Sequence, residues 1–228
     1  MYDLYIANKN YSSWSLRPWV LLRELAIPFR ERLVPFGGNS NPDAFKAFSP
    51  TGKVPCLVDG PITVWDSLAI TEYVGERHAG VWPAEVAARA WARSAAAEMH
   101  SGFFGLRNHC PMNCGIRVTL GAIQPALRRD LARLEELWAD GMARFGGPFL
   151  TGARFCAVDA FFAPVAFRIQ TYEPPLNETA RRYAARLLAL PSMQSWYEAA
   201  LAETWRDEEH EADARAMGSW RQDLRAGS

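Results

Sequence analysis

The stretch Asn10-Tyr11-Ser12-Ser13-Trp14-Ser15-Leu16-Arg17-Pro18-Trp19 decides how the beginning of the chain is organised. It follows an alternating apolar run, residues 2–7, and leads into a segment whose apolar residues recur at helical spacing. This pattern predicts a strand, a short polar loop and a helix. We expect Ser15 to be the N-cap of this helix and Pro18 to lie in its first turn.

The three serines of this stretch have two interpretations. They can all be turn and capping residues, or one can cap the helix while the other two hydroxyls face a ligand. The second interpretation has a physical basis, because a helix N-terminus presents unpaired backbone N–H groups and the positive end of the helix dipole. A helix N-terminus therefore favours an anion. Motifs later in the chain help to decide between the two interpretations of the serines.

Composition and charge limit the class of protein. The chain has 228 residues, of which 49% are hydrophobic and 22% charged, as in globular proteins with one large domain or two modest ones. Lys plus Arg and Asp plus Glu both number 25, so the net charge is zero and does not favour a nucleic-acid or membrane-surface partner. No apolar segment approaches the roughly 20 residues that span a bilayer. We therefore expect a cytoplasmic protein with a small-molecule or protein partner.

The cysteines do not predict a disulfide framework or a metal site. All four lie among apolar neighbours in a chain too large to need disulfides, so we interpret them as reduced thiols. Cys110 and Cys114 are four residues apart beside His109, but no second ligand pair follows at a suitable spacing. Cys56, which precedes Leu57 in a short apolar run, is expected in the core.

The first 80 residues predict a compact α/β domain. Residues 29–34 alternate apolar and charged side chains as a half-buried strand does. Asp59-Gly60 between two short apolar runs predicts a hairpin, and the apolar spacing after Asp66 predicts a helix that ends at about residues 78–80. Pro55 has no N–H for a ladder, so it belongs at a strand start or a turn and could be cis.

From Pro83 onward the pattern is helical. We expect helices over residues 85–107, 124–144, 159–171, 178–189 and 192–202. The charge run at residues 203–215 is interpreted as a solvated tail or a final helix. The sequence thus predicts two domains, residues 1–80 and 84–228, with a short linker at residues 79–84.

Four motifs, in this order, resemble those of the cytosolic glutathione transferases. Residues 12–17, SSWSLR, resemble the Ser-Ser-Cys-Ser-x-Arg signature of serine-type, zeta-like members, with Trp14 at the cysteine position. Residues 51–55 resemble the Gly-Lys-Val-Pro loop, residues 65–70 the Glu-Ser-x-Ala-Ile element, and residues 155–160 the capping box of the central helix. The resemblance covers nearly the whole chain. It implies an α+β fold of two domains, a thioredoxin-like domain followed by an all-α helical bundle.

The resemblance also implies a site for the tripeptide glutathione as co-substrate. The family's loop proline, here Pro55, is cis, and the backbone of Val54 is expected to pair with the cysteinyl residue in the manner of strand addition. Asp66 and Ser67, at a helix N-terminus, are expected to hold the γ-glutamyl end. Lys53 is a candidate partner for the glycyl carboxylate.

The thiol of glutathione would then lie over the opening loop. Ser12 matches the first serine of the signature and is the first candidate to activate the thiol; Ser13 is the second and Tyr11 the third. Lowering a thiol pKa of about 8.5 by about two units requires about 2.7 kcal/mol. A hydroxyl hydrogen bond to an anion and a helix N-terminus together supply roughly that amount. Since residues 11–15 contain no cysteine, disulfide exchange at this place is not expected.

The second substrate is expected between the two domains, in a pocket of mixed polar and apolar side chains. Its candidate residues are Tyr11, Trp14, Phe103, Phe104, Arg107 and Met112. The histidine at position 100 has no carboxylate partner that the sequence reveals.

The function that the resemblance implies is transfer of glutathione to alkyl or aryl electrophiles, a detoxification reaction, by a homodimer. One alternative is glutathione-dependent isomerisation of maleylacetoacetate-like compounds, although Trp14 departs from the signature of the enzymes that catalyse it. A glutathione-dependent peroxidase or dehalogenase would use the same thiolate. The alternative from another class is a glutathione-binding or ligand-binding protein that has kept the fold and lost turnover.

Overall fold

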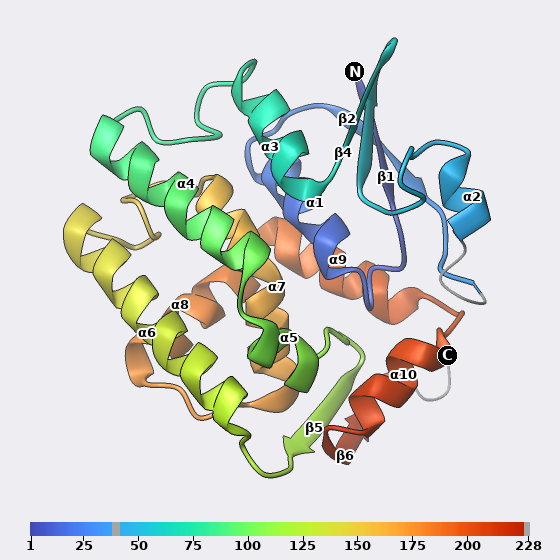
Figure 1. Cartoon of the computed structure of the whole chain (residues 1–228), viewed down its shortest axis with the longest axis vertical. Helices are drawn as coiled ribbons and strands as arrows, with labels where there is room; N and C mark the ends of the chain where they lie inside the picture. The colour runs from blue at the N-terminus through green and yellow to red at the C-terminus, as the bar shows by residue number, and fades with distance from the viewer. Residues whose placement is uncertain (38–41, 226–228) are drawn as a thin grey trace.

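The computed structural model describes residues 1–37 and 42–225, and it has a mixed α/β part followed by a mainly helical part (Figure 1). The element order of the first part is the predicted one, strand-helix-strand and then hairpin-helix. Its elements are β1 Tyr2–Ile6, α1 Ser13–Glu24, β2 Phe29–Leu33, α2 Pro42–Lys46, β3 Cys56–Asp59, β4 Ile62–Trp65 and α3 Ser67–Gly75.

The first part is built on a four-stranded sheet in the order β2-β1-β3-β4. β1 is parallel to β2, whereas the β1–β3 and β3–β4 pairs are antiparallel. Burial alternates along β1, so that Leu4 and Ile6 are fully buried on one face. This arrangement confirms the predicted thioredoxin-like fold.

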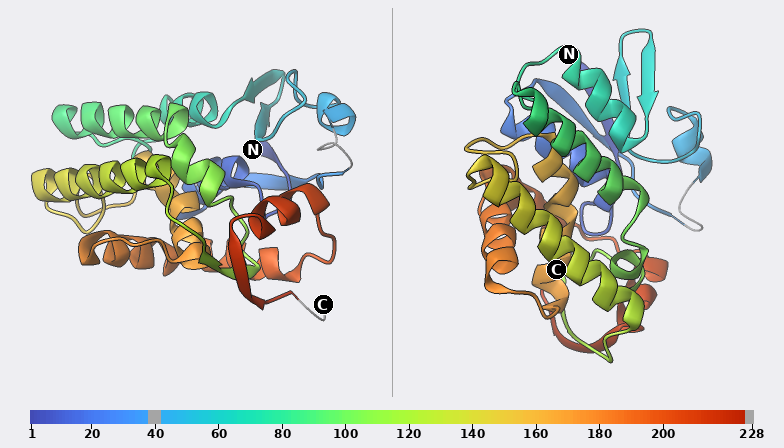
Figure 2. Two further views of the ribbon diagram at one scale, coloured as in Figure 1. Left: turned by 60° about the horizontal axis from the view of Figure 1, so that its bottom comes forward. Right: turned by 60° about the vertical axis from the view of Figure 1, so that its left-hand side comes forward.

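Helix α1 connects the two parts of the molecule. It packs against α3 beside the sheet and against α7 and α9 of the helical part. In both views of Figure 2, α1 lies between the sheet and the helices that follow. The N-terminus of α1, where the serines are, therefore lies where the two parts meet.

The second part contains the helices α4 Val86–Ser101, α5 Phe104–His109, α6 Pro125–Phe145, α7 Ala157–Tyr172, α8 Glu178–Leu188, α9 Pro191–Ala202 and α10 Glu208–Arg215. α7 is its centre: every residue from Ala157 to Arg168 is buried, and the helix packs against α1, α4 and α8. A helix that is apolar on nearly every side is expected in such a position. The segment that joins α3 to α4 contains the predicted linker at residues 79–84.

Two features of the helical part differ from the sequence prediction. The single helix expected over residues 85–107 is two helices, because the chain turns after α4 and Phe103 has a left-handed φ of 57°. The part is also not all-α, since β5 Ile116–Leu120 pairs antiparallel with β6 Gly218–Asp223. These strands are distant in the sequence, and β6 follows a charge run, so local patterning did not reveal the pair.

Candidate active site

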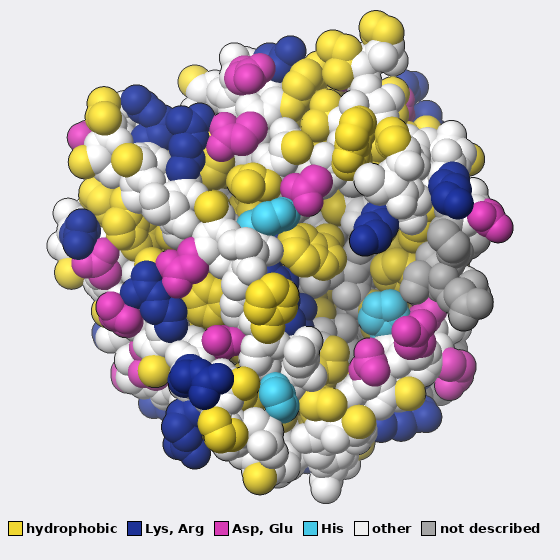
Figure 3. Space-filling model, viewed as in Figure 1, with side chains coloured by type: hydrophobic (Ala, Val, Ile, Leu, Met, Phe, Trp, Pro, Cys, Tyr) yellow, Lys and Arg dark blue, Asp and Glu magenta, His cyan; other side chains and the backbone are white. Residues whose placement is uncertain are grey.

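Two adjoining hollows lie beside the N-terminus of α1. Their volumes are about 460 and 440 Å³, and both are lined by Trp14, Thr51, Lys53 and Val54. The space-filling view shows a hollow in this face of the molecule (Figure 3). We call the first hollow the peptide hollow and the second the serine hollow.

The peptide hollow contains the residues predicted to bind a peptide ligand. It is further lined by Pro55, Trp65, Asp66 and Ser67. The Val54–Pro55 peptide bond is cis, and the proline leads directly into β3. An extended backbone edge and a helix N-terminus thus border the same hollow, which suits a ligand with both a backbone and a carboxylate.

Asp66 and Ser67 have partners of their own at the start of α3. Asp66 is the N-cap, and its Oδ1 accepts hydrogen bonds from the amides of Leu68 at 2.7 Å and Ala69 at 3.4 Å. Its Oδ2 lies 3.4 Å from Nε2 of His100, a carboxylate partner for this histidine that the sequence did not reveal. The buried Ser67 accepts a hydrogen bond from Arg17 at 3.4 Å.

The serine hollow begins with the opening loop. Ser12, not Ser15, is the N-cap residue of α1, and its side chain does not cap the helix. The predicted cap was wrong because the buried Ser15 Oγ accepts a hydrogen bond from the backbone N–H of Ala7 at 3.3 Å. Pro18 lies inside the helix, beyond the first turn in which it was expected.

The hydroxyls of Ser12 and Ser13 have different partners. Ser12 Oγ donates to Ser15 Oγ at 2.7 Å, so its proton is directed into the protein. Ser13 Oγ accepts a hydrogen bond from Arg168 at 3.4 Å, an interaction that uses a lone pair and not its proton. Both serines line the hollow. Of these two serines, Ser13 is therefore the one whose hydroxyl proton has no acceptor among the described residues.

Tyr11 lines the serine hollow, but its hydroxyl is bound by residues from the end of the chain. It donates to Glu211 Oε1 at 2.5 Å and accepts from Arg225 at 3.0 Å. Burial, followed by the hydrogen bond to Glu211, raises the pKa of Tyr11 to about 12. Of the three hydroxyls considered from the sequence, this one is engaged with a carboxylate.

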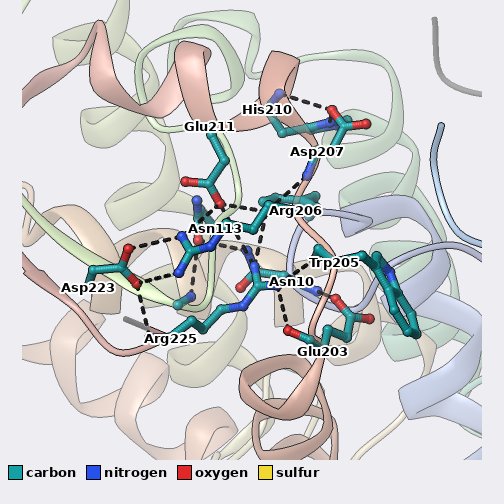
Figure 4. A network of polar contacts seen from close by, with 12 residues as sticks. Asn10, Asn113, Glu203, Trp205, Arg206, Asp207, His210, Glu211, Asp223 and Arg225 are labelled. Carbon is teal, nitrogen blue, oxygen red and sulfur yellow. Dashed lines mark hydrogen bonds and ion pairs between the residues drawn. The ribbon is translucent and has the colours of Figure 1, made fainter. Parts of the chain in front are cut away.

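Residues far along the chain hold the opening loop in place (Figure 4). Glu203 accepts hydrogen bonds from the backbone N–H groups of Lys9 at 2.5 Å and Asn10 at 3.3 Å. Arg225, which is buried, donates to the backbone carbonyl oxygens of Glu203 and Trp205 as well as to the tyrosine hydroxyl. The charge run at residues 203–215 contains the final helix α10, one of the two predicted alternatives, and its Glu203 and Glu211 are buried against this loop instead of solvated.

Three guanidinium groups surround the start of α1. Arg17 and Arg107 lie 4.2 and 4.7 Å from the centroid of the Trp14 ring, and Arg168 reaches Ser13. Burial lowers the pKa of all three, that of Arg107 to about 10, and neighbouring guanidiniums lower the pKa of Arg17 and Arg107 further. None of them pairs with a carboxylate within the part of the chain that the structure describes. The hollow is therefore a favourable place for an anion.

Only some of the expected pocket residues reach the serine hollow. Tyr11, Trp14, Arg107 and Met112 line it, together with Pro111. Phe103 is buried in the hydrophobic core instead, and Phe104 is 65% exposed on α5, so neither lies among the lining residues. The break between α4 and α5, which the sequence did not predict, turns these two rings away.

The sequence did not point to four side chains that line the serine hollow, namely Arg168, Phe36, Phe45 and His210. Arg168 had a detectable signal, because it is the charged residue in the otherwise apolar segment 160–169. His210 lies in a charge run with no pattern that points to a site, and its position depends on how α10 docks.

The described residues provide no metal site and no membrane span. In residues 1–37 and 42–225, no three His, Cys, Asp or Glu side chains come close enough to hold a metal ion. Within the same ranges, no helix is both long enough and apolar enough to cross a bilayer. The four cysteines are buried thiols, and burial raises the pKa of Cys56, the residue expected in the core, to about 11.

Comparison with known proteins connects this fold and site to one class. Residues 11–77 match the family described as "Glutathione S-transferase, N-terminal domain". This match spans the serine loop, the cis-proline loop and the start of α3. Together with the fold, this match shows that the chain resembles the glutathione S-transferases through its N-terminal part.

Individual proteins are similar to this chain over different lengths. The chain is 28% identical over 218 residues to human glutathione S-transferase theta-1, an alignment that covers 87% of this chain and 83% of the relative. It is 43% identical over 63 residues to the dichloromethane dehalogenase of Methylorubrum extorquens, covering 26% of this chain. The aligned part spans only 22% of that dehalogenase.

Solved structures share the overall fold. A glutathione transferase homologue from Burkholderia, solved with bound glutathione, has a TM-score of 0.66 and 25% identity over 89% of this chain and 99% of its own. A diazinon-metabolizing glutathione S-transferase from the silkworm Bombyx mori has a TM-score of 0.69 over 88% of this chain and 97% of its own. At 15% identity, the silkworm structure supports the fold alone.

Proposed function

We propose that this protein is a glutathione S-transferase of the serine type, which activates the glutathione thiol for attack on electrophilic small molecules. The observation that carries the proposal is the meeting of two hollows at one helix N-terminus. One is bordered by a cis-proline loop and the other by two serine hydroxyls. A ligand with an extended backbone and a thiol fits across both.

Glutathione would lie with its γ-glutamyl end in the peptide hollow. The backbone N–H and hydroxyl of Ser67 bind the γ-glutamyl carboxylate at the start of α3, where the helix dipole favours an anion. Asp66, through the oxygen that does not cap the helix, binds the γ-glutamyl amine. The backbone of Val54 pairs with the cysteinyl residue, and Lys53 takes the glycyl carboxylate.

The thiol would then enter the serine hollow, and Ser13 is our first choice to donate a hydrogen bond to its thiolate. Arg168 already donates to Ser13, so the serine is oriented with its own proton still available. Ser12 supports the loop through Ser15. A hydrogen bond to an anion contributes about 1.5–3 kcal/mol, and about 2.7 kcal/mol lowers a thiol pKa by two units. The guanidiniums around Trp14 favour the thiolate in the same direction.

The proposal is tested by comparing Ser13→Ala and Ser12→Ala with the wild type in steady-state conjugation of glutathione to chlorodinitrobenzene. We expect Ser13→Ala to lower kcat/KM roughly tenfold or more, and Ser12→Ala to lower it less. The matched control is Ser94→Ala, which changes an exposed serine on α4 whose hydroxyl bonds only its own helix, and which should leave kcat/KM unchanged.

Two outcomes would contradict this mechanism. Full activity in both loop variants would exclude a serine as the donor. Binding of the wild type to immobilised glutathione with no turnover of any electrophile would favour the alternative of a binding protein.

Dehalogenation is a second candidate reaction, favoured by the local similarity to dichloromethane dehalogenase. The same thiolate would displace chloride from a small alkyl halide instead of an aryl one. Release of chloride from dichloromethane, measured with and without glutathione, tests this candidate. Chloride release that does not need glutathione would speak against it.

A further inference from the structure

His210 is brought to the serine hollow by α10 and is held there by a carboxylate. Its Nδ1 lies 2.8 Å from Asp207 Oδ1, and both residues are visible in Figure 4. Asp207 is also the N-cap of α10, since the same oxygen accepts a hydrogen bond from the His210 backbone N–H at 3.2 Å. The pair fixes which ring nitrogen is bound to the protein.

The imidazole ring is stacked between two aromatic rings. The Tyr11 ring lies 5.1 Å from it, centroid to centroid, and the Phe36 ring lies 4.9 Å from it, with interplanar angles of 25° and 26°. With the ring stacked on two aromatic rings and Nδ1 bound, Nε2 is the ring nitrogen that remains for a ligand in the serine hollow, which His210 lines. Among residues 1–37 and 42–225, none forms a hydrogen bond with this nitrogen.

This arrangement is suited to donating a proton, because the imidazole ring is both oriented and placed at the hollow. A carboxylate on Nδ1 orients the ring, as it does in many sites that use histidine as an acid or a base. The ring lines the same hollow as Ser12 and Ser13, over which the thiolate is proposed to lie. A simple capping interaction explains the Asp207 contact, but it does not require the ring to be stacked at the hollow.

We infer that His210, positioned by Asp207, donates a proton to the second substrate. This inference rests on the proposed function and deepens it. It assigns to the hollow a class of electrophile, namely those whose attack by a thiolate creates a basic anion, such as α,β-unsaturated carbonyl compounds and epoxides.

An unsaturated carbonyl compound needs one proton from the protein after the thiolate has attacked it. The thiolate sulfur forms a bond to the β-carbon, and the electron pair of the carbon–carbon double bond moves toward the carbonyl group to give an enolate. His210 Nε2–H protonates the enolate, and the neutral imidazole takes up a proton from solvent, into which the thiol released its own. An aryl halide instead releases halide, which needs no proton, so the histidine has no such role there.

The test measures kcat/KM of the full chain with acrolein and with chlorodinitrobenzene for the wild type and for His210→Gln. We expect the variant to lose roughly tenfold or more with acrolein, at the low end of what general acid catalysis contributes, and about threefold at most with the aryl halide. Asp207→Asn keeps a capping side chain and removes the negative charge. It should lower acrolein turnover selectively as well, whereas a packing role would lower both activities in parallel.

His109→Gln is the matched control. In the wild type, His109 Nδ1 lies 2.7 Å from the Gly105 carbonyl oxygen, and His109 does not line the serine hollow. We therefore expect His109→Gln to keep both activities at the wild-type level. Thermal unfolding of each variant separates folding defects from catalytic ones.

The remaining outcomes distinguish a failure of the role of His210 from a failure of the proposed function. Equal losses with the two electrophiles, or no loss in His210→Gln, would overturn the role of His210 and leave the transferase proposal standing. A wild type that conjugates chlorodinitrobenzene but neither acrolein nor styrene oxide would do the same. A wild type inert toward every electrophile would refute the proposed function and this inference together.

Discussion

Tyr11 shows how the direction of a single hydroxyl decides between interpretations. It directly precedes the two serines, and from the sequence it was a third candidate to activate a thiol. In the structure its proton is donated to Glu211, which is 1% exposed. A donor already bonded to a buried carboxylate is a poor donor to a thiolate.

We therefore expect Tyr11→Phe to affect stability more than catalysis. Removing the hydroxyl leaves buried Glu211 without one donor, which costs about 1–3 kcal/mol of unfolding free energy. Urea denaturation measures this loss. Tyr5→Phe is the control, because the Tyr5 ring stacks on Phe48 and a phenylalanine ring keeps that contact. We expect this variant to change the free energy of unfolding by less than about 0.5 kcal/mol. If Tyr11→Phe abolished turnover at unchanged stability, the tyrosine would replace Ser13 in the mechanism.

The β5–β6 pair joins the helical part to the serine loop. The backbone N–H of Leu224 donates to the Gly115 carbonyl oxygen at 2.8 Å, and that of Cys114 donates to the Asn10 carbonyl oxygen at 3.1 Å. Asn10 also donates through its side chain to Asn113 at 2.9 Å. The strand pair thus fixes both the last described residues and the first loop.

The start of β6 is tightly packed and gives a sharp test of this pairing. A Cβ at Gly218 would lie 2.1 Å from the Thr119 carbonyl oxygen, whereas at Gly121 the nearest atom would be 3.6 Å away. We expect Gly218→Ala to destabilise the protein by about 1–3 kcal/mol through the resulting backbone shift, and Gly121→Ala to have little effect. Thermal unfolding of the two variants checks this; equal melting temperatures would show that the pair does not support the fold.

The elements also show what the sequence could and could not predict. The sheet, the hairpin and helices α6 to α9 have patterns within one segment, so period and turn chemistry revealed them. The cis-proline loop and Asp66-Ser67 were found because short motifs carry them. The partner of β5 lies about a hundred residues away, and the break at Phe103 depends on a left-handed φ, so no local pattern could predict either.

The candidate site, like the fold, could be predicted only where its residues lie in local motifs. Its N-terminal half, from Ser12 to Ser67, follows from motifs in one domain. Arg168 and His210 come from α7 and α10, and their place at the serine hollow depends on how three distant segments pack. Even where the right residues were named, the directions of the hydroxyls of Ser12 and Tyr11 were set by partners that only the fold brings close.

The outer surface formed by β4 and α3 carries exposed apolar side chains. Ile62 and Trp65 are 42% and 44% exposed, and a shallow hollow of about 510 Å³ lies between the strand and the helix. Figure 3 shows hydrophobic side chains gathered over this region. Such a patch favours association, and the homodimer implied by the family resemblance is our proposal for what covers it.

We expect the protein to sediment at about twice its chain mass of 25.5 kDa, and Ala69→Glu to shift it toward the monomer. Ala69 is exposed in this surface, so the added charge should disrupt the contact and leave the fold intact. Ala185→Glu, on the exposed face of α8, is the control. Analytical ultracentrifugation gives the result, and a monomeric wild type would refute the proposal.

The contact between Tyr11 and Arg225 spans 214 positions of the chain. During synthesis the thioredoxin-like part leaves the ribosome long before Arg225 is made. Until then the serine loop lacks its contacts with Glu203, Glu211 and Arg225. The nascent first domain can form its sheet, but its loop lacks the groups that hold it. The proposed turnover of glutathione would therefore begin only when α10 and β6 have folded back on the opening loop, and we expect the first 80 residues made alone to be inactive.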